Sequence, residues 1–241
     1  MTSNNLSGKN VVIIGGTAGI GLAAAQAAAE LGANVWAAGR SAAHIEKAKE
    51  LSNGSFEVRQ ADTHDAQSLQ AIFAEAGSID HLISAAVGGE RTLKPFLEQT
   101  EDQFKAAYDK LWGYAKVVRS GAPYLAADAT ITLISGSPAR KIKPAQSALS
   151  CVGASVENLV CCLAVEMAPI RVNVVSPGTV DTAMFDHFGD EKQDKLKAMT
   201  ATHLIKRAGT SDEVAQGIIF VMNNGFTTGT TIDVDGGRIL S

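Results

Sequence analysis

The sequence predicts one α/β domain built on a doubly wound parallel sheet of about seven strands. Segments with strand and helix character alternate along all 241 residues, an order typical of parallel sheets covered by helices on both faces. The β-branched run Val11–Ile14 leads straight into a glycine-rich turn and an alanine-rich helix, as buried parallel strands do. No repeat, low-complexity tract or linker divides residues 1–241, so we expect a single domain.

Short apolar, β-branched runs mark the strands, and longer apolar patterns with helical periodicity mark the helices. The strands are expected at about 10–15, 33–38, 56–60, 81–85, 130–135, 171–175 and 231–234. The helices are expected at about 19–31, 42–52, 65–76, 100–120, 147–168 and 211–223.

Two connections, about 87–99 and 183–208, are long, and long connections in a domain of this size often form binding loops or lids. Both follow strands, so they should lie at the carboxyl end of the sheet, where open α/β sheets bind ligands. Asp190–Met199 in the second connection has the pattern of a charged amphipathic helix, either a solvated surface helix or a mobile lid. His187 and His203 are expected at the surface, with contact to substrate as the alternative.

Composition argues against nucleic-acid and membrane partners. The net charge is −4 and the sequence pI about 5.7, with no block of five or six like charges. We see no uninterrupted apolar stretch of membrane-spanning length, and the polar start MTSNNLSGKN lacks the apolar core of a secretory signal, which favours a cytoplasmic location. We expect the three cysteines, Cys151, Cys161 and Cys162, to be free buried thiols, and we expect no metal site.

The glycine-rich turn has the features of a phosphate cradle. Glycine permits a tight turn and a close approach of a pyrophosphate to the backbone. The N–H groups at the start of the helix carry the positive end of its dipole. A glycine motif alone can be only a tight turn, but the strand before it and the helix after it favour dinucleotide binding. The residues expected to hold the dinucleotide are Gly15, Thr17, Ala18, Gly19 and Ile20.

The end of the second strand indicates which dinucleotide binds. NAD-selective sites generally place a carboxylate there for the ribose hydroxyls, but this strand ends Gly39-Arg40-Ser41. A guanidinium suits a 2′-phosphate and Ser41 adds a hydroxyl, so the sequence favours NADP(H); the alternative is that Arg40 is an ordinary surface arginine. Asp62 and Thr63 are placed to meet the adenine edge, although Asp62 fits equally well as a helix N-cap.

The chain resembles the short-chain dehydrogenase/reductase family over nearly its whole length. The family's TGxxxGxG motif corresponds to residues 14–21, with Ile14 in place of threonine. The segments Leu163–Asn173, Ser176–Thr182 and Gly229–Gly237 are also typical of the family.

This resemblance implies a Rossmann-type domain, a nicotinamide cofactor and a homodimer or homotetramer. Subunits would pair through the helices at 100–120 and 147–168. The resemblance also implies that residues after the fourth and sixth strands line the cofactor site: Ala85, Ala86, Pro177, Gly178, Val180 and Thr182.

The catalytic positions depart from the family pattern. The family's Tyr-x-x-x-Lys pair falls on Leu149 and Gly153, and the family's serine falls on Gly136, between Ser135 and Ser137. In the family the tyrosine transfers a proton while the hydride moves, and the lysine lowers the pKa of the tyrosine. Such a general acid contributes roughly 10²–10⁴ in rate, and Leu149 has no proton to give.

Lys110 occupies the position of a helical asparagine of the family, and it is our candidate for the missing proton donor. We expect its side chain to fill the space that Gly153 vacates. A partly buried ammonium has a lowered pKa and can act as an acid near neutrality, while Ser135 or Ser137 would bind the carbonyl oxygen. The alternative is that Lys110 only pairs with a carboxylate or reaches solvent.

The sequence therefore favours an NADP(H)-dependent oxidoreductase that acts on a small carbonyl or alcohol through a non-standard proton relay. One alternative is a catalytically silent NADP(H)-binding sensor or scaffold, which the loss of the tyrosine and lysine favours. Another is a lyase or isomerase that uses the cofactor only structurally. The two long loops favour an enzyme, because a sensor needs no substrate pocket, but the fold itself does not decide.

Overall fold

The computed structural model describes residues 5–87 and 92–241 and contains a seven-stranded sheet whose strands are all parallel. The strands are β1 (Asn10–Ile14), β2 (Asn34–Gly39), β3 (Glu57–Gln60), β4 (Ile79–Ser84), β5 (Leu125–Ile134), β6 (Arg171–Pro177) and β7 (Thr231–Val234). Their order is β3-β2-β1-β4-β5-β6-β7. The predicted fold class is confirmed, and the order reverses between β1 and β4, where such sheets open a binding crevice.

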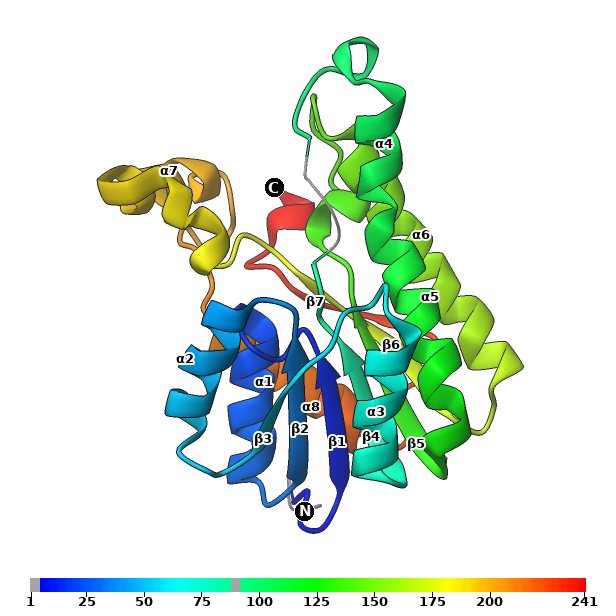
Figure 1. Cartoon of the computed structure of the whole chain (residues 1–241). Helices are drawn as coiled ribbons and strands as arrows, with labels where there is room; N and C mark the ends of the chain where they lie inside the picture. Colours follow the sequence, from blue (N-terminus) through cyan, green and yellow to red (C-terminus); the bar gives the residue numbers. More distant parts are fainter. Residues whose placement is uncertain (1–4, 88–91) are drawn as a thin grey trace.

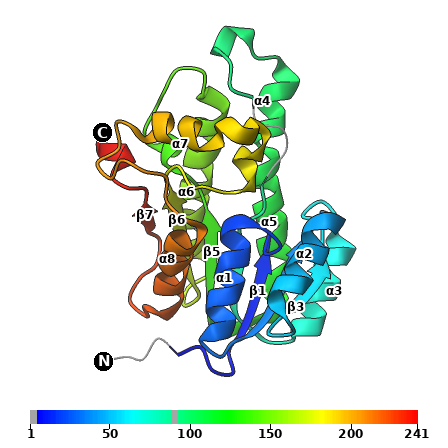
Figure 2. The same ribbon diagram turned by 90° about the vertical axis from the view of Figure 1, so that its left-hand side faces the viewer.

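Helices cover both faces of the sheet (Figures 1 and 2). On one face lie α1 (Gly19–Glu30), α2 (Ala42–Ser52) and α8 (Ser211–Asn223), and on the other α3 (Ala66–Ala76), α5 (Asp109–Gly121) and α6 (Ser147–Glu166). Alternate residues of the central strands feed the two cores: Val11 and Ile13 face α1, whereas Val12 and Ile14 face α3 and α5.

Side-chain caps explain where several helices begin. Ser41, Asp65, Thr100 and Thr210 each accept a hydrogen bond from a backbone N–H in the first turn of the helix that follows. Thr100 begins α4 (Glu101–Ala107), so the helix predicted over 100–120 is two helices. The break lies at Tyr108, whose N–H bonds to the carbonyl of Lys105, three residues back, at 2.9 Å.

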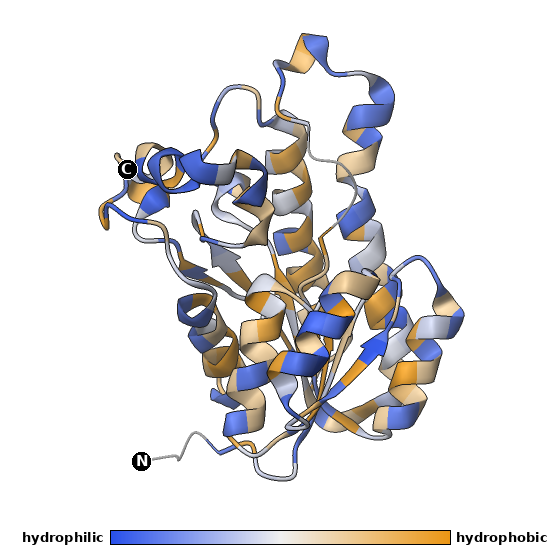
Figure 3. Cartoon of the chain, turned by 60° about the vertical axis from the view of Figure 1, so that its left-hand side comes forward, coloured by the Kyte–Doolittle hydropathy of each residue, from blue (hydrophilic) through white to orange (hydrophobic). Residues whose placement is uncertain are grey.

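The two long connections lie at the carboxyl end of the strands (Figure 1). The first contains the short 3₁₀ helix η1 (Phe96–Glu98) and leads into α4; part of it, 88–91, lies outside the described residues. The second contains η4 (Ala183–Glu191) and α7 (Lys192–Thr200), which agrees with the helix expected over 190–199. Mostly hydrophilic residues form α7 (Figure 3). The remaining short helices are η2 (Ala122–Tyr124), η3 (Ser137–Ala139) and η5 (Arg238–Leu240).

The helix α6 bears on two expectations. It is 20 residues long and contains an 18-residue window with a mean hydropathy of 1.8, so by length and composition alone it is apolar enough to cross a membrane. This is weak support for a membrane span, because polar residues interrupt the helix and its buried face packs on the sheet. Cys151, Cys161 and Cys162 are free, as expected, but exposed instead of buried. Exposure does not mean isolation, since the Cys161 thiol lies 3.6 Å from the carbonyl oxygen of Gly229.

A buried histidine should make stability depend on pH. His81 in β4 is 7% exposed, shares a 2.7 Å hydrogen bond with Thr130, and has its pKa lowered by burial to about 4. The unfolded chain therefore binds one more proton than the folded protein between about pH 6.5 and pH 4. We expect this histidine to lower the free energy of unfolding by about 3 kcal/mol as the pH falls across that window.

Denaturant titrations at pH 7.5 and pH 4 would measure this loss as a difference between the wild type and His81→Gln. His44→Gln, a change at an exposed histidine of α2, is the control and should behave as the wild type. Equal pH dependence in wild type and His81→Gln would contradict the assignment.

Candidate functional site

The glycine-rich loop after β1 packs so closely on its neighbours that side chains are excluded. Gly15 has φ +87°, and a Cβ atom there would collide with the backbone of Ala85 and Ala86 after β4. A Cβ at Gly21 would collide with the carbonyl oxygen of Gly15. The loop therefore brings bare backbone to the crevice between β1 and β4, as binding a pyrophosphate requires.

The N-terminus of α1 is open to an anion. Ala18 provides no side-chain cap, and the first turn contains no acidic residue, so its N–H groups and the positive dipole end are available to phosphate. Thr182 lies against this turn, with its methyl group 3.6 Å from where a Cβ of Gly19 would be. Thr17 differs from expectation: it is 6% exposed, and its hydroxyl packs against Gly39 at the end of β2.

The residues expected around the adenosine half lie together at the ends of β2 and β3. Arg40 is exposed, and Ser41 caps α2 by accepting a 3.4 Å hydrogen bond from the His44 N–H. The backbone N–H of His64 and, to a smaller extent, the charge of Arg40 hold the pKa of the Asp62 carboxyl below its usual range.

The alternative role for Asp62 is wrong, because Asp65 caps α3. Asp62 instead stabilises its own turn by accepting a 2.9 Å hydrogen bond from the His64 N–H. Thr63 packs on α5, where a Cβ at Gly113 would lie 2.9 Å from the Thr63 hydroxyl oxygen. The uncapped turn of α1 and the bare loop together fit the pyrophosphate of a dinucleotide.

A cavity of about 230 Å³ lies next to this region, at the carboxyl ends of the central strands. Both long connections contribute to its wall, through Val87 and Leu93 and through Met184, Phe185 and Met199. The wall also includes Ile20 and the residues expected beside the nicotinamide: Ala85, Ala86, Pro177, Gly178, Val180 and Thr182.

Lys110 lines this cavity from the first turn of α5. Its Nζ donates a 3.1 Å hydrogen bond to the main-chain carbonyl of Ser135 and lies 5.6 Å from the centre of the Tyr114 ring. Tyr114, which is 1% exposed, in turn donates a 3.1 Å hydrogen bond to the carbonyl of Ile134. The end of β5 therefore holds both side chains at the cavity wall.

The structure brings Lys110 and Gly153 to the same cavity, but it leaves little room for a side chain at Gly153 itself. A Cβ there would lie only 2.9 Å from the Cβ of Ala139, because η3 packs directly on α6. Leu149, one turn earlier, lines the cavity with an apolar side chain.

The two candidate serines have different surroundings. Ser135 lines the cavity, and its hydroxyl donates a 2.9 Å hydrogen bond to Glu157 of α6. Ser137 is fully buried, its hydroxyl has no hydrogen-bond partner among the described residues, and it is absent from the cavity wall. The structure therefore gives no support to carbonyl binding by Ser137.

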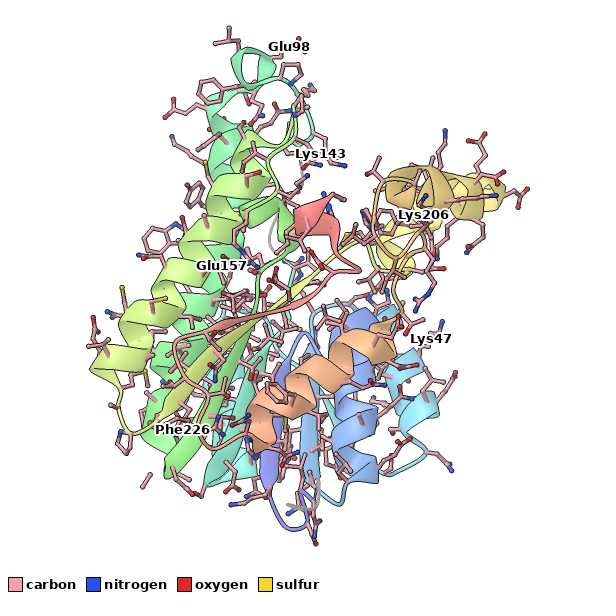
Figure 4. The ribbon with its side chains drawn as sticks, turned by 180° about the vertical axis from the view of Figure 1, so that it is seen from behind. Lys47, Glu98, Lys143, Glu157, Lys206 and Phe226 are labelled. Carbon is pink, nitrogen blue, oxygen red and sulfur yellow. The ribbon has the colours of Figure 1, made fainter. Side chains whose placement is uncertain are left out.

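An ion network links η3, α6 and β7 behind the cavity. Arg140 pairs with Asp233 and, at 3.1 Å, with Glu157, which points from α6 toward the C-terminal segment (Figure 4). The hydrogen bond to Asp233 and the charge of Glu157 raise the pKa of Arg140. This network was not predicted from the sequence. The one available signal was the spacing of Glu157, which follows Gly153 by one helical turn and therefore lies on the same face of α6.

Two further residues near the cavity were missed or misplaced. Arg238 lines the cavity from η5 and is 9% exposed. The sequence interpretation missed it; the signal that could have indicated it is an arginine directly after Asp235-Gly236-Gly237. His203 is 2% exposed, so the expectation of a surface histidine is wrong, whereas His187 is exposed as expected. Burial and the charge of Arg238 lower the pKa of His203, so its ring is neutral at pH 7.

Comparisons with known proteins agree with this fold. Residues 15–238 match the family model described as enoyl-(acyl carrier protein) reductase. The short-chain dehydrogenase/reductase ucsE of Acremonium sp is 29% identical over 262 residues, which cover 100% of this chain and 98% of the relative.

Solved structures are similar over the same length. The structure of MalC reductase/Diels–Alderase from Malbranchea aurantiaca has a TM-score of 0.88 at 29% identity and covers 98% of this chain and 97% of its own. A small-chain dehydrogenase in complex with NADPH has a TM-score of 0.83 at 29% identity, with coverage of 98% and 100%. The chain belongs to the short-chain dehydrogenase/reductase family, and its relatives are oxidoreductases.

We predict that Arg40 distinguishes the two nicotinamide cofactors. Arg40→Glu should weaken NADPH binding about 10- to 100-fold, since a charge-assisted hydrogen bond contributes about 1.5–3 kcal/mol, and should change NADH binding little. Calorimetric titration measures both affinities. The control is Arg119→Glu, the same change at an exposed arginine in the last turn of α5. An equal loss for NADPH and NADH would contradict a 2′-phosphate contact.

Proposed function

We propose that this protein is an NADP(H)-dependent oxidoreductase that interconverts a small carbonyl compound and its alcohol. The observation that carries the proposal is the position of Lys110: an ammonium group lines the cavity beside the expected nicotinamide site, while Leu149 and Gly153 offer no proton donor. When bound, NADP(H) supplies or accepts the hydride.

In this mechanism Lys110 is the proton donor. During reduction a hydride reaches the carbonyl carbon and a proton passes from Nζ to the carbonyl oxygen, which leaves a neutral amine that regains a proton from solvent. The main-chain carbonyl of Ser135 orients Nζ through the 3.1 Å hydrogen bond. The Ser135 hydroxyl donates to Glu157, so we assign Ser135 a positioning role and leave the carbonyl oxygen to Lys110.

The choice of NADP(H) follows from the residues at the end of β2. Arg40 is exposed there, and neither Gly39 nor Ser41 offers a carboxylate for a ribose diol. The related dehydrogenase solved with NADPH is consistent with this choice. A silent NADP(H)-binding sensor is disfavoured, because a sensor needs no cavity with cationic side chains beside the nicotinamide.

A second candidate is a reaction that does not consume the cofactor. The related MalC protein is named both a reductase and a Diels–Alderase. The apolar side chain of Leu149 in the cavity favours a similar divergence here, because a cycloaddition or isomerisation needs shape and orientation more than a strong acid. Isotope transfer separates the two candidates.

The direct test follows a label from the cofactor. NADPH carrying deuterium at C4, in each stereochemical form, is incubated with the protein and a panel of aldehydes, ketones, quinones and imines, and mass spectrometry of the products detects the label. Deuterium in a product establishes the reductase. Tight NADPH binding without any labelled product would contradict the proposal and favour a protein that keeps its cofactor unchanged.

We predict that Lys110→Met lowers kcat by roughly 10²–10⁴, the contribution of a general acid, with a smaller change in KM. Steady-state kinetics on the substrate found above measures both. Lys116→Met, the same change at an exposed lysine of the same helix, should leave kcat and KM unaltered. Full turnover in Lys110→Met would exclude Lys110 as the donor.

We also propose that the protein is a homodimer or homotetramer that buries one face of α5 and α6. Trp112 of α5 is 63% exposed and borders a depression with Leu111 and Leu159, an apolar surface of the kind that subunit interfaces cover. Trp112→Glu should convert the assembly to smaller species in light scattering while NADPH binding persists. An unchanged mass would contradict this interface.

A further inference from the structure

Arg238 is held at the cavity by a rigid turn. It follows Gly236 and Gly237, which have φ values of +62° and +74°, and a Cβ at Gly237 would lie only 2.7 Å from the Leu204 side chain. The carboxylate of Asp235 accepts hydrogen bonds of 2.8 and 2.9 Å from the N–H groups of Gly237 and Ile239. These contacts fix where the Arg238 side chain leaves the backbone.

The side chain of Arg238 is buried with an unsatisfied donor. The residue is 9% exposed, and its Nε forms no hydrogen bond within the described part of the chain. Burial lowers the pKa of Arg238, and only the charge of Asp235 opposes this effect; yet both oxygens of that carboxylate are engaged by the turn. An arginine remains charged under all ordinary conditions, so a full positive charge stands at the cavity wall.

The described part of the cavity wall adds no negative charge. Among the described residues that line it, none is aspartate or glutamate, and Lys110 is a second cation. The remaining wall is largely apolar, with Leu149, Val152 and Phe185 among its residues. A positive, poorly solvated pocket attracts an anion strongly, because charges interact more strongly where water is excluded.

Gln146 offers a second polar group at the same wall. It lies just before the first residue of α6, and its side-chain oxygen is buried and accepts no hydrogen bond from any described residue. A buried amide oxygen without a partner is costly. This oxygen is an acceptor, so only the N–H groups of the same amide could bind an anion. A bound oxoanion would accept hydrogen bonds from the amide group after a rotation of the side chain, and from the guanidinium.

We propose that Arg238 binds a carboxylate of the substrate, with Gln146 as a second contact, so that the substrate is a small oxo acid or hydroxy acid. The part of this inference that rests on the proposed function is the reacting carbonyl or alcohol group of the substrate. The anion site is inferred from the geometry around Arg238 and does not depend on that function. A planar carboxylate accepts two parallel hydrogen bonds from a guanidinium. Its single charge balances that of Arg238, and phosphate is tested below as the alternative anion.

Binding of defined probes tests the site without any turnover. Pyruvate, acetoacetate and levulinate, each with its methyl ester, are titrated by calorimetry into protein saturated with NADP⁺. We expect at least one acid to bind at least tenfold more tightly than its ester. Arg238→Met should remove this preference, and Arg238→Lys, which keeps the charge but loses the fork, should retain part of it. Arg119→Met, at an exposed arginine, is the matched control.

The stability of the free protein separates a ligand-binding role from a structural one. Removing an unpaired buried charge relieves its desolvation, so the melting temperature of Arg238→Met without ligands should equal or exceed that of the wild type. A lower melting temperature with acid binding intact would make Arg238 structural and overturn the proposal.

Other outcomes also overturn it: no acid binds, the esters bind as well as the acids, or Arg238→Met weakens NADP⁺ or inorganic phosphate binding instead of the acids. The last result would assign the guanidinium to a phosphate group. Acid binding that depends on Arg238 would support the anion site even where the labelled cofactor transfers no deuterium, so failure of the proposed function and failure of this inference are distinguishable.

Discussion

The contact between Gly153 of α6 and Ala139 of η3 determines how this active site differs from that of its family. A Cβ at Gly153 would lie 2.9 Å from the Ala139 Cβ, so η3 occupies the space into which the family's lysine would project. With this position closed, a tyrosine at residue 149 would lack its partner. In the proposed function the proton donor comes from another element, because α5 places Lys110 at the same cavity.

The packing of η3 on α6 is reinforced by charge. Arg140, directly after η3, pairs with Glu157 of α6 and Asp233 of β7, and Ser135 at the end of β5 donates to the same Glu157. These partly buried groups connect η3, α6, β7 and the end of β5 beside the cavity. They also anchor the C-terminal segment from which Arg238 reaches the cavity. Fixed positions for Lys110 and Arg238 matter, because binding and proton transfer require donors held in place.

Local patterns predicted the fold well because each pattern has a local cause. The β-branched strands, the helix caps and the glycine loop are determined by residues that are neighbours in sequence, and all seven strands were predicted. The candidate site was harder to predict because it depends on contacts between distant segments. The space beside Gly153 is filled by Ala139, 14 positions away, and the burial of Arg238 depends on a turn packed against Leu204. The cysteines of α6 were wrongly expected to be buried, and helical periodicity alone could not correct this, because it does not show which face meets the sheet.

A double-mutant cycle at the contact of η3 with α6 tests the central claim most directly. Gly153→Ala should lower the free energy of unfolding by about 1–3 kcal/mol, the usual cost of overpacking, and Ala139→Gly in the same chain should restore most of that loss. NADPH titration of each variant would show that the cofactor site is intact. A neutral Gly153→Ala, or one that Ala139→Gly fails to rescue, would show that the space is open to a side chain and contradict the account of why the family's lysine is absent.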